Sequence, residues 1–262
     1  MASSDPPHVS ALSITPVKAL RMQRRERLEL RRDGVRGDRA MFLVDDRGRM
    51  VNGKHHPTLT AVVAELGEDG QLEIELPDGR RAAGEAAPGE ELQVRFYRMT
   101  RPARAIGGPF SELLSAYVGA PLRLVAFTDG RSAVDRGAAG AVSMLSTTSA
   151  DALARAAGRE TIDTRRFRMT IELSGSEPFA EDGWIDRVLR VGSARIKPFG
   201  HVGRCNVTTL DPDRGTRDLP TLDILRELRG GLATTEPLAL GVHCAVLEPG
   251  EVALGDTLVP DG

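Results

Sequence analysis

The sequence predicts a mainly β protein with a few helices, which is an α+β fold class. Short runs that alternate apolar and polar residues, or that are wholly apolar, recur along the chain and are typical of strands. Gly- and Asp-rich turn signals separate these runs. Three other segments have the apolar spacing of amphipathic helices. Regular spacing of short strands further favours a barrel or a sandwich.

Strands dominate the first part of the chain. The segment 98–108, RMTRPARAIGG, breaks their pattern and is expected to be a connection. A second core is therefore expected to begin after about residue 98, which divides the chain into domains 1–98 and 99–262. The expected strands of the first domain are VSALSI (9–14), RLELRR (27–32), AMFLVDD (40–46), TAVVAEL (60–66), QLEIEL (71–76) and ELQVRFY (91–97).

Helices are expected at three places in the second domain. Segment 109–119 has apolar residues at helical spacing and a glycine that can end the helix. Segment 147–158 begins with Thr148 and Asp151 placed as an N-cap and its N3 acid. Segment 221–231 has leucines three residues apart and ends in glycines. The expected strands between the helices are LRLVAF, RFRMTIEL, SARIKPF, CNVTTL, GVHCAVL and DTLVP.

Composition excludes several function classes. The formal net charge is −2, so no basic excess favours nucleic acid or an acidic membrane surface as a partner. No window approaches the apolar length of a membrane-spanning helix. The first 20 residues lack the apolar core of a signal peptide. These features predict a cytoplasmic protein with reduced cysteines.

Cys205 is a candidate for chemistry. If CNVTTL is a strand, Cys205 shares a face with Val207 and Thr209 and stands where a loop delivers it. Arg204 and His201 are close in sequence and can stabilise a thiolate. The alternative is that the sulfur is simply buried, as most free cysteines are. The second cysteine, in the apolar run VHCAVL, fits that alternative.

Several basic residues stand at the ends of expected elements. Lys18 follows SITPV, Arg39 precedes a strand, and Arg166 and Arg168 flank Phe167. Each could be solvated surface charge. Together they could hold a phosphate, because arginine offers a bidentate fork and lysine a point charge.

The segment from 166 to 229, with its R-C-x-x-T-T-x-D-P motif, resembles the MOSC domain, named for the C-terminal domain of molybdenum cofactor sulfurase. The final PLALGVHCAVLEPGEVALGDTLVP is similar to the closing strands of that domain. The segments VSALSITPVKAL and GDRAMFLVDDRGRMVNGKHHPTL resemble the β-barrel domain that precedes MOSC in the mitochondrial amidoxime-reducing component and its bacterial relatives. The resemblance covers nearly the whole chain and implies two β-barrel domains.

The resemblance implies a molybdenum cofactor. In amidoxime-reducing members the motif cysteine, here Cys205, ligates molybdenum, and soft thiolate suits this metal. Family members hold the phosphate of the pterin with a lysine and two arginines, which correspond to Lys18, Arg39 and Arg168. The cofactor pocket is expected between the two β-rich halves. At the level of the family, pyridoxal phosphate binding is also implied.

Further positions follow from the same resemblance. Ser146, with Thr147 beside it, corresponds to a segment that contacts the cofactor. Thr170 takes the place of the asparagine in the family's R-x-N pattern. Ala19 stands where the family often has serine, and Lys54 where relatives often have arginine, so a hydroxyl and a bidentate fork are missing.

Three functions remain open from the sequence. The first is a molybdenum oxidoreductase that reduces small N-hydroxylated compounds. Because the chain has no iron–sulfur cysteine set, its electrons would come from a separate donor protein. The second is a sulfur carrier with a persulfide on Cys205. The third is a non-catalytic β module, which the joint presence of Lys18, Arg39, Arg168 and Cys205 disfavours.

Overall fold

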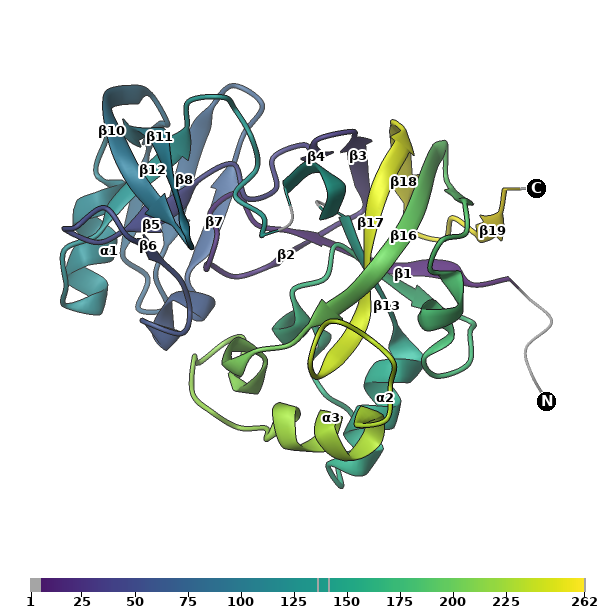
Figure 1. Ribbon diagram of the computed structural model, residues 1–262. Helices are drawn as coiled ribbons and strands as arrows, with labels where there is room; N and C mark the ends of the chain where they lie inside the picture. Colours follow the sequence, from purple (N-terminus) through teal and green to yellow (C-terminus); the bar gives the residue numbers. More distant parts are fainter. Residues whose placement is uncertain (1–5, 136, 141, 262) are drawn as a thin grey trace.

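The computed structural model describes residues 6–135, 137–140 and 142–261. Strands dominate it, as the sequence predicted, and they form two β-rich halves that lie side by side (Figure 1). No helix of the described chain is long and apolar enough to cross a membrane.

The second half is built on a curled sheet of eight strands in the order β19-β15-β16-β17-β13-β14-β1-β2. Strands β13 and β14 are parallel, and the other neighbours are antiparallel. In chain order these strands are β1 (His8–Ile14), β2 (Gln23–Arg25), β13 (Val142–Ser146), β14 (Ile171–Ser174), β15 (Leu189–Val191), β16 (Ala194–Gly203), β17 (Ala239–Glu248) and β19 (Leu258–Pro260).

A three-stranded sheet, in the order β18-β3-β4, packs against this large sheet. Leu12, Leu28, Ile171 and Val252 share the core between them, and all four are nearly inaccessible to solvent. The strands are β3 (Arg27–Arg31), β4 (Gly34–Val35) and β18 (Gly250–Ala253).

The first half holds two antiparallel sheets, in the orders β10-β11-β12-β5-β6 and β7-β8-β9. Phe110 and Leu114 of helix α1 (Phe110–Val118) pack into the core of this half. Its strands are β5 (Phe42–Val44), β6 (Met50–Val51), β7 (Val63–Leu66), β8 (Gln71–Glu75), β9 (Arg81–Glu85), β10 (Pro88–Phe96), β11 (Met99–Ile106) and β12 (Arg123–Phe127).

Helices α2 (Thr147–Ala156) and α3 (Thr221–Arg229) lie together beneath the large sheet (Figure 1). Leu153 and Leu225 share a buried cluster with Phe167, so this packing anchors the loop on either side of Phe167. The short 3-10 helices are η1 (Pro57–Ala61), η2 (Gly137–Gly140), η3 (Thr164–Phe167), η4 (Ala180–Trp184) and η5 (Asn206–Thr209).

The three predicted helices are present. Helix α1 is capped by Gly119, as predicted, in the left-handed conformation that a C-terminal glycine favours. The other two helices differ from the prediction in detail. The N-cap of α2 is Ser146, not Thr148, and it makes no side-chain capping bond. In α3, Leu228 is exposed and the buried face consists of Thr221, Ile224 and Leu225.

Two segments differ from the predicted secondary structure. The expected connection 98–108 contains β11, which pairs with β10 and β12. The predicted strand CNVTTL is instead the 3-10 helix η5 and its cap. In both cases long-range pairing or local side-chain bonds override the local pattern of apolar residues.

Pairing also crosses the expected division at residue 98. Strands β1 to β4 pair within sheets of the second half, whereas β11 and β12 pair within the first. The structural halves therefore do not follow the ranges 1–98 and 99–262. A local sequence pattern carries no information on which distant strand will be the partner.

Candidate functional site

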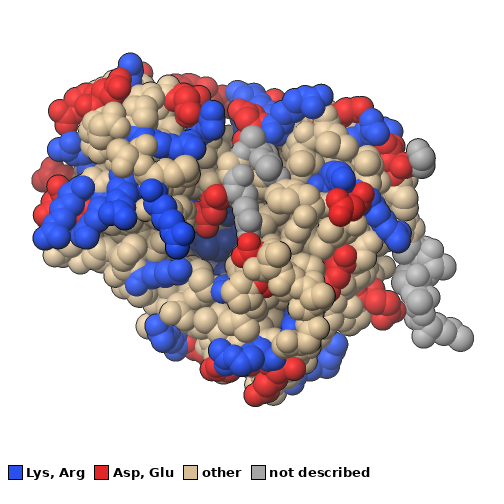
Figure 2. Space-filling model, viewed as in Figure 1, with Lys and Arg blue, Asp and Glu red and all other residues tan. Residues whose placement is uncertain are grey.

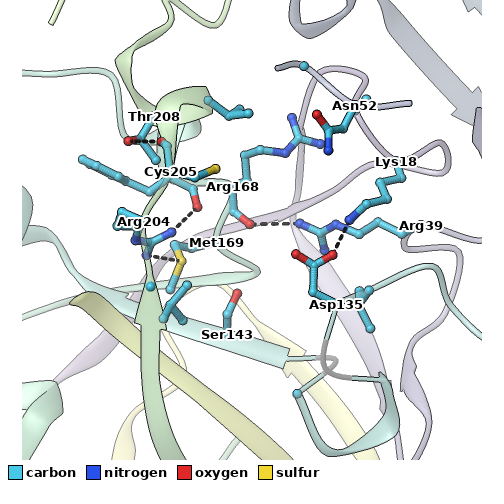
Figure 3. Close-up of a pocket in the computed structure, with 18 of the residues that line it drawn as sticks. Lys18, Arg39, Asn52, Asp135, Ser143, Arg168, Met169, Arg204, Cys205 and Thr208 are labelled. Carbon is cyan, nitrogen blue, oxygen red and sulfur yellow. Dashed lines mark hydrogen bonds and ion pairs between the residues drawn. The ribbon is translucent and has the colours of Figure 1, made fainter. Parts of the chain in front are cut away.

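A cavity of about 360 Å³ lies between the two halves and is lined by residues from both. Lys18, Arg39 and Tyr97 come from the first part of the chain, and Arg168 and Cys205 come from the second. In Figure 3, Cys205 lies on one side, Lys18 and Arg39 on the other, and Arg168 between them. The volume is in the range of pockets that bind small molecules or cofactors, about 300–1,000 Å³.

Cys205 is placed by the turn that follows β16. Its backbone carbonyl accepts hydrogen bonds from the Thr208 amide and the Thr208 hydroxyl, both at 2.9 Å. The Thr209 hydroxyl donates to the Asn206 carbonyl at 2.7 Å. The two threonines of the motif thus hold the 3-10 turn closed, and the half-buried thiol faces the cavity.

The loop after η5 is fixed against the first half by Gly215. This glycine has φ +67°, and a Cβ there would lie 2.5 Å from the Pro57 carbonyl oxygen. Only glycine tolerates both this conformation and this approach. The contact helps to keep the two walls of the cavity together.

The cationic wall of the cavity consists of Lys18, Arg39 and Arg168. Arg39 pairs with the buried carboxylate of Asp38, and its Nη2 donates to the Arg168 carbonyl at 3.0 Å. Lys18 Nζ lies 2.6 Å from Asp135 and over the ring of Tyr97. Burial lowers the pKa of Lys18, an effect that Asp135 opposes and that Arg39 and Arg168 reinforce.

Arg168 is the least satisfied member of this wall. Its Nη2 is buried and has no hydrogen-bond partner in the described structure. Burial lowers the pKa of its guanidinium to about 10, and Arg39 beside it acts in the same direction. A buried cation of this kind is costly unless an anion completes it. Its geometry therefore suits a bound phosphate.

Backbone strain is concentrated around this cavity. Among the described residues, seven besides the glycines have positive φ. Four of them line the cavity, and they are Ala19, Arg39, Tyr97 and Arg168. Such conformations cost of order 1–3 kcal/mol each, and they are concentrated at active sites and ligand-binding sites. Their grouping here therefore supports a functional role for the cavity.

The two residues expected to stabilise a thiolate have different positions. Arg204 lines the cavity next to Cys205, and it donates to the Phe167 carbonyl at 2.8 Å and to the sulfur of Met169 at 2.9 Å. Burial lowers the pKa of Arg204 to about 9, against the effect of Cys205. His201 pairs with Asp182 at 3.1 Å and is not among the cavity-lining residues.

Three predicted cofactor contacts lie elsewhere. The Ser146 hydroxyl bonds with those of Thr148 and Ser176, both at 2.7 Å, at the start of α2. Thr147 contacts Ser174 at 3.4 Å. The hydroxyl of Thr170 is 3.3 Å from that of Ser143. Ser146, Thr147 and Thr170 do not line the cavity, because their hydroxyls complete bonds between neighbouring strands and turns.

Tyr97 and Asp135 line the cavity but were not predicted from the sequence. Tyr97 stands at the tip of the β10–β11 hairpin, and its hydroxyl donates to Asp135 at 2.7 Å. Burial, followed by Asp135, raises the pKa of Tyr97. Lys18 lowers the pKa of Asp135 in spite of the opposing effect of burial. In the sequence, the only feature that could have pointed to Tyr97 was its place as an aromatic residue at the end of an expected strand. No sequence feature distinguished Asp135 from other acidic residues.

The donors in the cavity fit a ligand that carries both a soft metal and a phosphate. Cys205 provides a soft sulfur donor, and Arg168 provides a buried guanidinium nitrogen that has no partner among the residues that the structure describes. Lys54 and Asn52 also line the cavity. The Arg168 side chain extends toward Asn52 (Figure 3). The chain's own residues are therefore compatible with a molybdenum cofactor.

Comparisons with known proteins find two domains along the chain. Residues 7–121 match the MOSC N-terminal beta barrel domain, and residues 131–259 match the MOSC domain. The mitochondrial amidoxime-reducing component 1 of Xenopus laevis is 27% identical over 288 residues, which cover 95% of this chain and 80% of that protein.

Two further similarities are more limited. The molybdenum cofactor sulfurase of Danio rerio is 37% identical over 70 residues, which cover 27% of this chain and 8% of that protein. The structure of the YUAD protein from Bacillus subtilis aligns with 97% of this chain and 94% of that chain, at a TM-score of 0.45 and 12% identity. The matched domains extend over nearly the whole sequence, and the chain belongs to the MOSC family of proteins with an N-terminal MOSC β-barrel domain.

Proposed function

We propose that this protein is a molybdenum-cofactor-dependent oxidoreductase that reduces N-hydroxylated compounds with electrons from a separate donor protein. The observation that carries the proposal is one cavity that holds both the motif thiol, Cys205, and the buried guanidinium of Arg168. The similarity to amidoxime-reducing components along 95% of the chain supports it.

Each cavity residue has a defined task in this proposal. Cys205 supplies the thiolate ligand, from a turn that its own carbonyl stabilises. Arg168, Arg39 and Lys18 hold the phosphate by charge-assisted hydrogen bonds. The bound cofactor supplies two-electron redox chemistry next to Cys205.

The overall reaction takes up two electrons and two protons. The N–O bond of the substrate breaks, the nitrogen takes up one proton, and the hydroxyl group takes up the other and leaves as water. The Tyr97 hydroxyl and the Asp135 carboxylate also line the cavity, and they are bonded to each other at 2.7 Å. In our proposal they orient the substrate's polar end.

A sulfur-transfer role is the second candidate. It is favoured by the local similarity to molybdenum cofactor sulfurases, at 37% identity over 70 residues. In that role Cys205 carries a persulfide and no metal. The cationic wall would then bind an anionic acceptor.

Metal analysis separates the two candidates. Protein produced in a host that supplies the cofactor should contain nearly stoichiometric molybdenum, and Cys205→Ser should lose most of it because oxygen is a poorer donor to this metal. With reduced viologen as the electron source, the wild type should reduce benzamidoxime and Cys205→Ala should not.

Cys244→Ser is the matched control. Cys244 is fully buried in the core, where burial raises the pKa of its thiol. Its replacement should leave the molybdenum content unchanged and cost some stability, since a hydroxyl is buried. Molybdenum-free protein with a labile persulfide on Cys205 would favour sulfur transfer. Molybdenum-loaded protein that reduces no N-oxygenated compound would refute the reductase alone.

A further inference from the structure

A group of basic side chains lies on the first half, on segments that also contribute Lys54 and Tyr97 to the cavity lining. We call it the mouth cluster, and it lies on the β5–β6 turn, on the segment after β6 and on the β10–β11 hairpin. Figure 2 shows Lys and Arg side chains gathered over this part of the molecule, beside the central hollow. The members are Arg47, Lys54, Arg95, Arg98 and Arg101.

The members of the mouth cluster lack carboxylate partners in the described structure. Within the described chain, none of its five members forms an ion pair. Arg95 donates only to the Tyr97 carbonyl, at 3.4 Å, and Arg101 only to the sulfur of Met99, at 3.7 Å. By contrast, exposed arginines elsewhere are commonly paired, as Arg27 is with Glu251 at 2.9 Å. Two exposed carboxylates lie near these residues: Asp46 is on the same turn as Arg47, and Asp135 accepts a hydrogen bond from Tyr97 and pairs with Lys18. The five basic side chains still leave the local charge positive.

The same surface has an apolar centre. Tyr97 and Met99 are 43% and 48% exposed, and both belong to the small group of large apolar side chains that face solvent. They stand at the hairpin tip, where Phe96 pairs with Met99. An aromatic and a methionine inside a basic rim match the composition of protein interfaces.

The surface is continuous with the cavity. Lys54 is a member of the mouth cluster, and Tyr97 lies at its centre. Both residues also line the cavity that contains Cys205. A protein docked on the hairpin would therefore be close to the ligand bound beside Cys205. Closeness of this kind is what an electron donor needs.

We propose that the mouth cluster, with Tyr97 and Met99 at its centre, is the docking surface for an acidic one-electron carrier protein. This inference rests on the proposed reductase function and names the partner's chemistry and its place of contact. Opposite charge steers such encounters and makes their rate depend on salt. The overall charge of −2 shows that the basic character is local.

A nucleic acid or an anionic membrane is a less suitable occupant. The mouth cluster is a compact patch around one hairpin, with no extended basic stripe that could follow a phosphate backbone. Its apolar centre is two side chains at the rim of a redox pocket. These features favour a small protein whose redox centre must approach that pocket.

Binding and turnover test the proposal with a charge-reversal pair. We would use Arg47→Glu/Arg98→Glu, since neither residue lines the cavity. The matched control, Arg155→Glu/Arg187→Glu, changes two exposed arginines of the second half that also lack ion pairs in the described structure. The probes are an acidic plant-type ferredoxin, an acidic flavodoxin and, as a basic carrier, cytochrome c.

Wild type should bind at least one acidic carrier by calorimetry at low salt, and should not bind cytochrome c. The mouth-cluster variant should weaken that binding, and the turnover driven by that carrier, by about tenfold or more, and raised salt should do the same to wild type. Turnover with reduced viologen should stay at the wild-type level in both variants. The control pair should bind the carrier as the wild type does.

Several outcomes would overturn the docking surface. They are binding of neither acidic carrier, equal losses in the two variants, and wild-type binding to DNA or anionic vesicles in place of carriers. Lack of viologen-driven turnover in molybdenum-loaded wild type would instead refute the reductase function. The calorimetric comparison does not depend on turnover, so the two failures can be told apart.

Discussion

Arg166 and Arg168 are two residues apart on one loop and have opposite surroundings. Arg166 is buried, with Nη1 and Nη2 bonded to the two carboxylate oxygens of Asp218 at 2.9 and 3.0 Å. It also donates to the carbonyls of Asp163 and Thr208. Arg168 is only partly buried as a residue, but its Nη2 is shielded from solvent and has no hydrogen-bond partner in the described structure. The strongest charge effect on its pKa comes from another cation, Arg39, and the carboxylates of Asp38 and Asp135 oppose it more weakly.

The difference separates a structural arginine from a ligand-binding one. Arg166 is fully compensated and secures the turn that carries Cys205, through the Thr208 carbonyl. Arg168 is held in a left-handed conformation, φ +56°, and its buried Nη2 donor has no hydrogen-bond partner within the described structure. Backbone strain and a buried donor without a partner raise the free energy of the unliganded protein. A ligand that satisfies the donor therefore binds with a larger gain in free energy.

The largest effect should come from Arg166→Ala. Removing one member of a buried ion pair costs on the order of 3–5 kcal/mol, because Asp218 and the two carbonyls lose their partner. Urea unfolding should show this loss. Arg159→Ala is the control, since Arg159 contacts the same Asp218 from the surface, at 3.1 Å, and should cost less than about 1 kcal/mol. Equal costs would contradict the distinction.

Glu181→Gln extends the comparison to a buried acid outside the cavity. Glu181 is inaccessible to solvent, and burial raises its pKa to about 7 although Ser149 donates to it at 2.9 Å. The folded protein therefore holds the proton more tightly than the unfolded chain. The stabilisation is complete below the unfolded pKa of 4.5 and is lost as the pH rises to about 7.

The free energy of unfolding of the wild type should thus fall by on the order of 3 kcal/mol between pH 4.5 and 8 because of Glu181. In Glu181→Gln this dependence of stability on pH should be absent. Urea unfolding at several pH values measures it. Glu177→Gln, at an exposed position nearby, should leave the slope unchanged. A wild-type stability that is flat across this range would show that Glu181 is ionised in the fold.

Arg168→Ala should reverse the pattern of Arg166→Ala. Stability should be unchanged or slightly higher, because an uncompensated buried cation is removed. Affinity for the phosphate-bearing cofactor should fall by about ten- to hundredfold, as expected for one charge-assisted contact of about 1.5–3 kcal/mol. Thermal unfolding and cofactor titration measure the two quantities. A collapsed melting temperature would make Arg168 structural.

The smallest effect should come from Asp135→Asn. This substitution frees Lys18 from the carboxylate 2.6 Å away and removes negative charge that opposes a bound anion. Affinity for inorganic phosphate, measured by calorimetry, should rise about threefold to tenfold. Asp129→Asn, which changes the surface pair with Arg131, should have no effect. Weaker phosphate binding in Asp135→Asn would contradict this role.

Much of the fold could be predicted from the sequence because it depends on local patterns. Alternating residues predicted strands such as β3 and β8, and the i, i+3, i+4 spacing with a final glycine predicted α1. The segment RMTRPARAI was missed as a strand, because β11 is stabilised by β10 and β12 on either side and has little pattern of its own.

The sequence by itself determined the residue types of the site, namely a motif thiol and a set of basic residues at element ends. The tertiary structure decided which of them meet. It brought Lys18, Arg39, Arg168 and Cys205 to one cavity and left Ser146, Thr147 and Thr170 outside it. It also paired Arg166 with Asp218 and left Nη2 of Arg168 without a hydrogen-bond partner among the described residues. Counter-ions come from distant segments, and burial is a property of the packed chain.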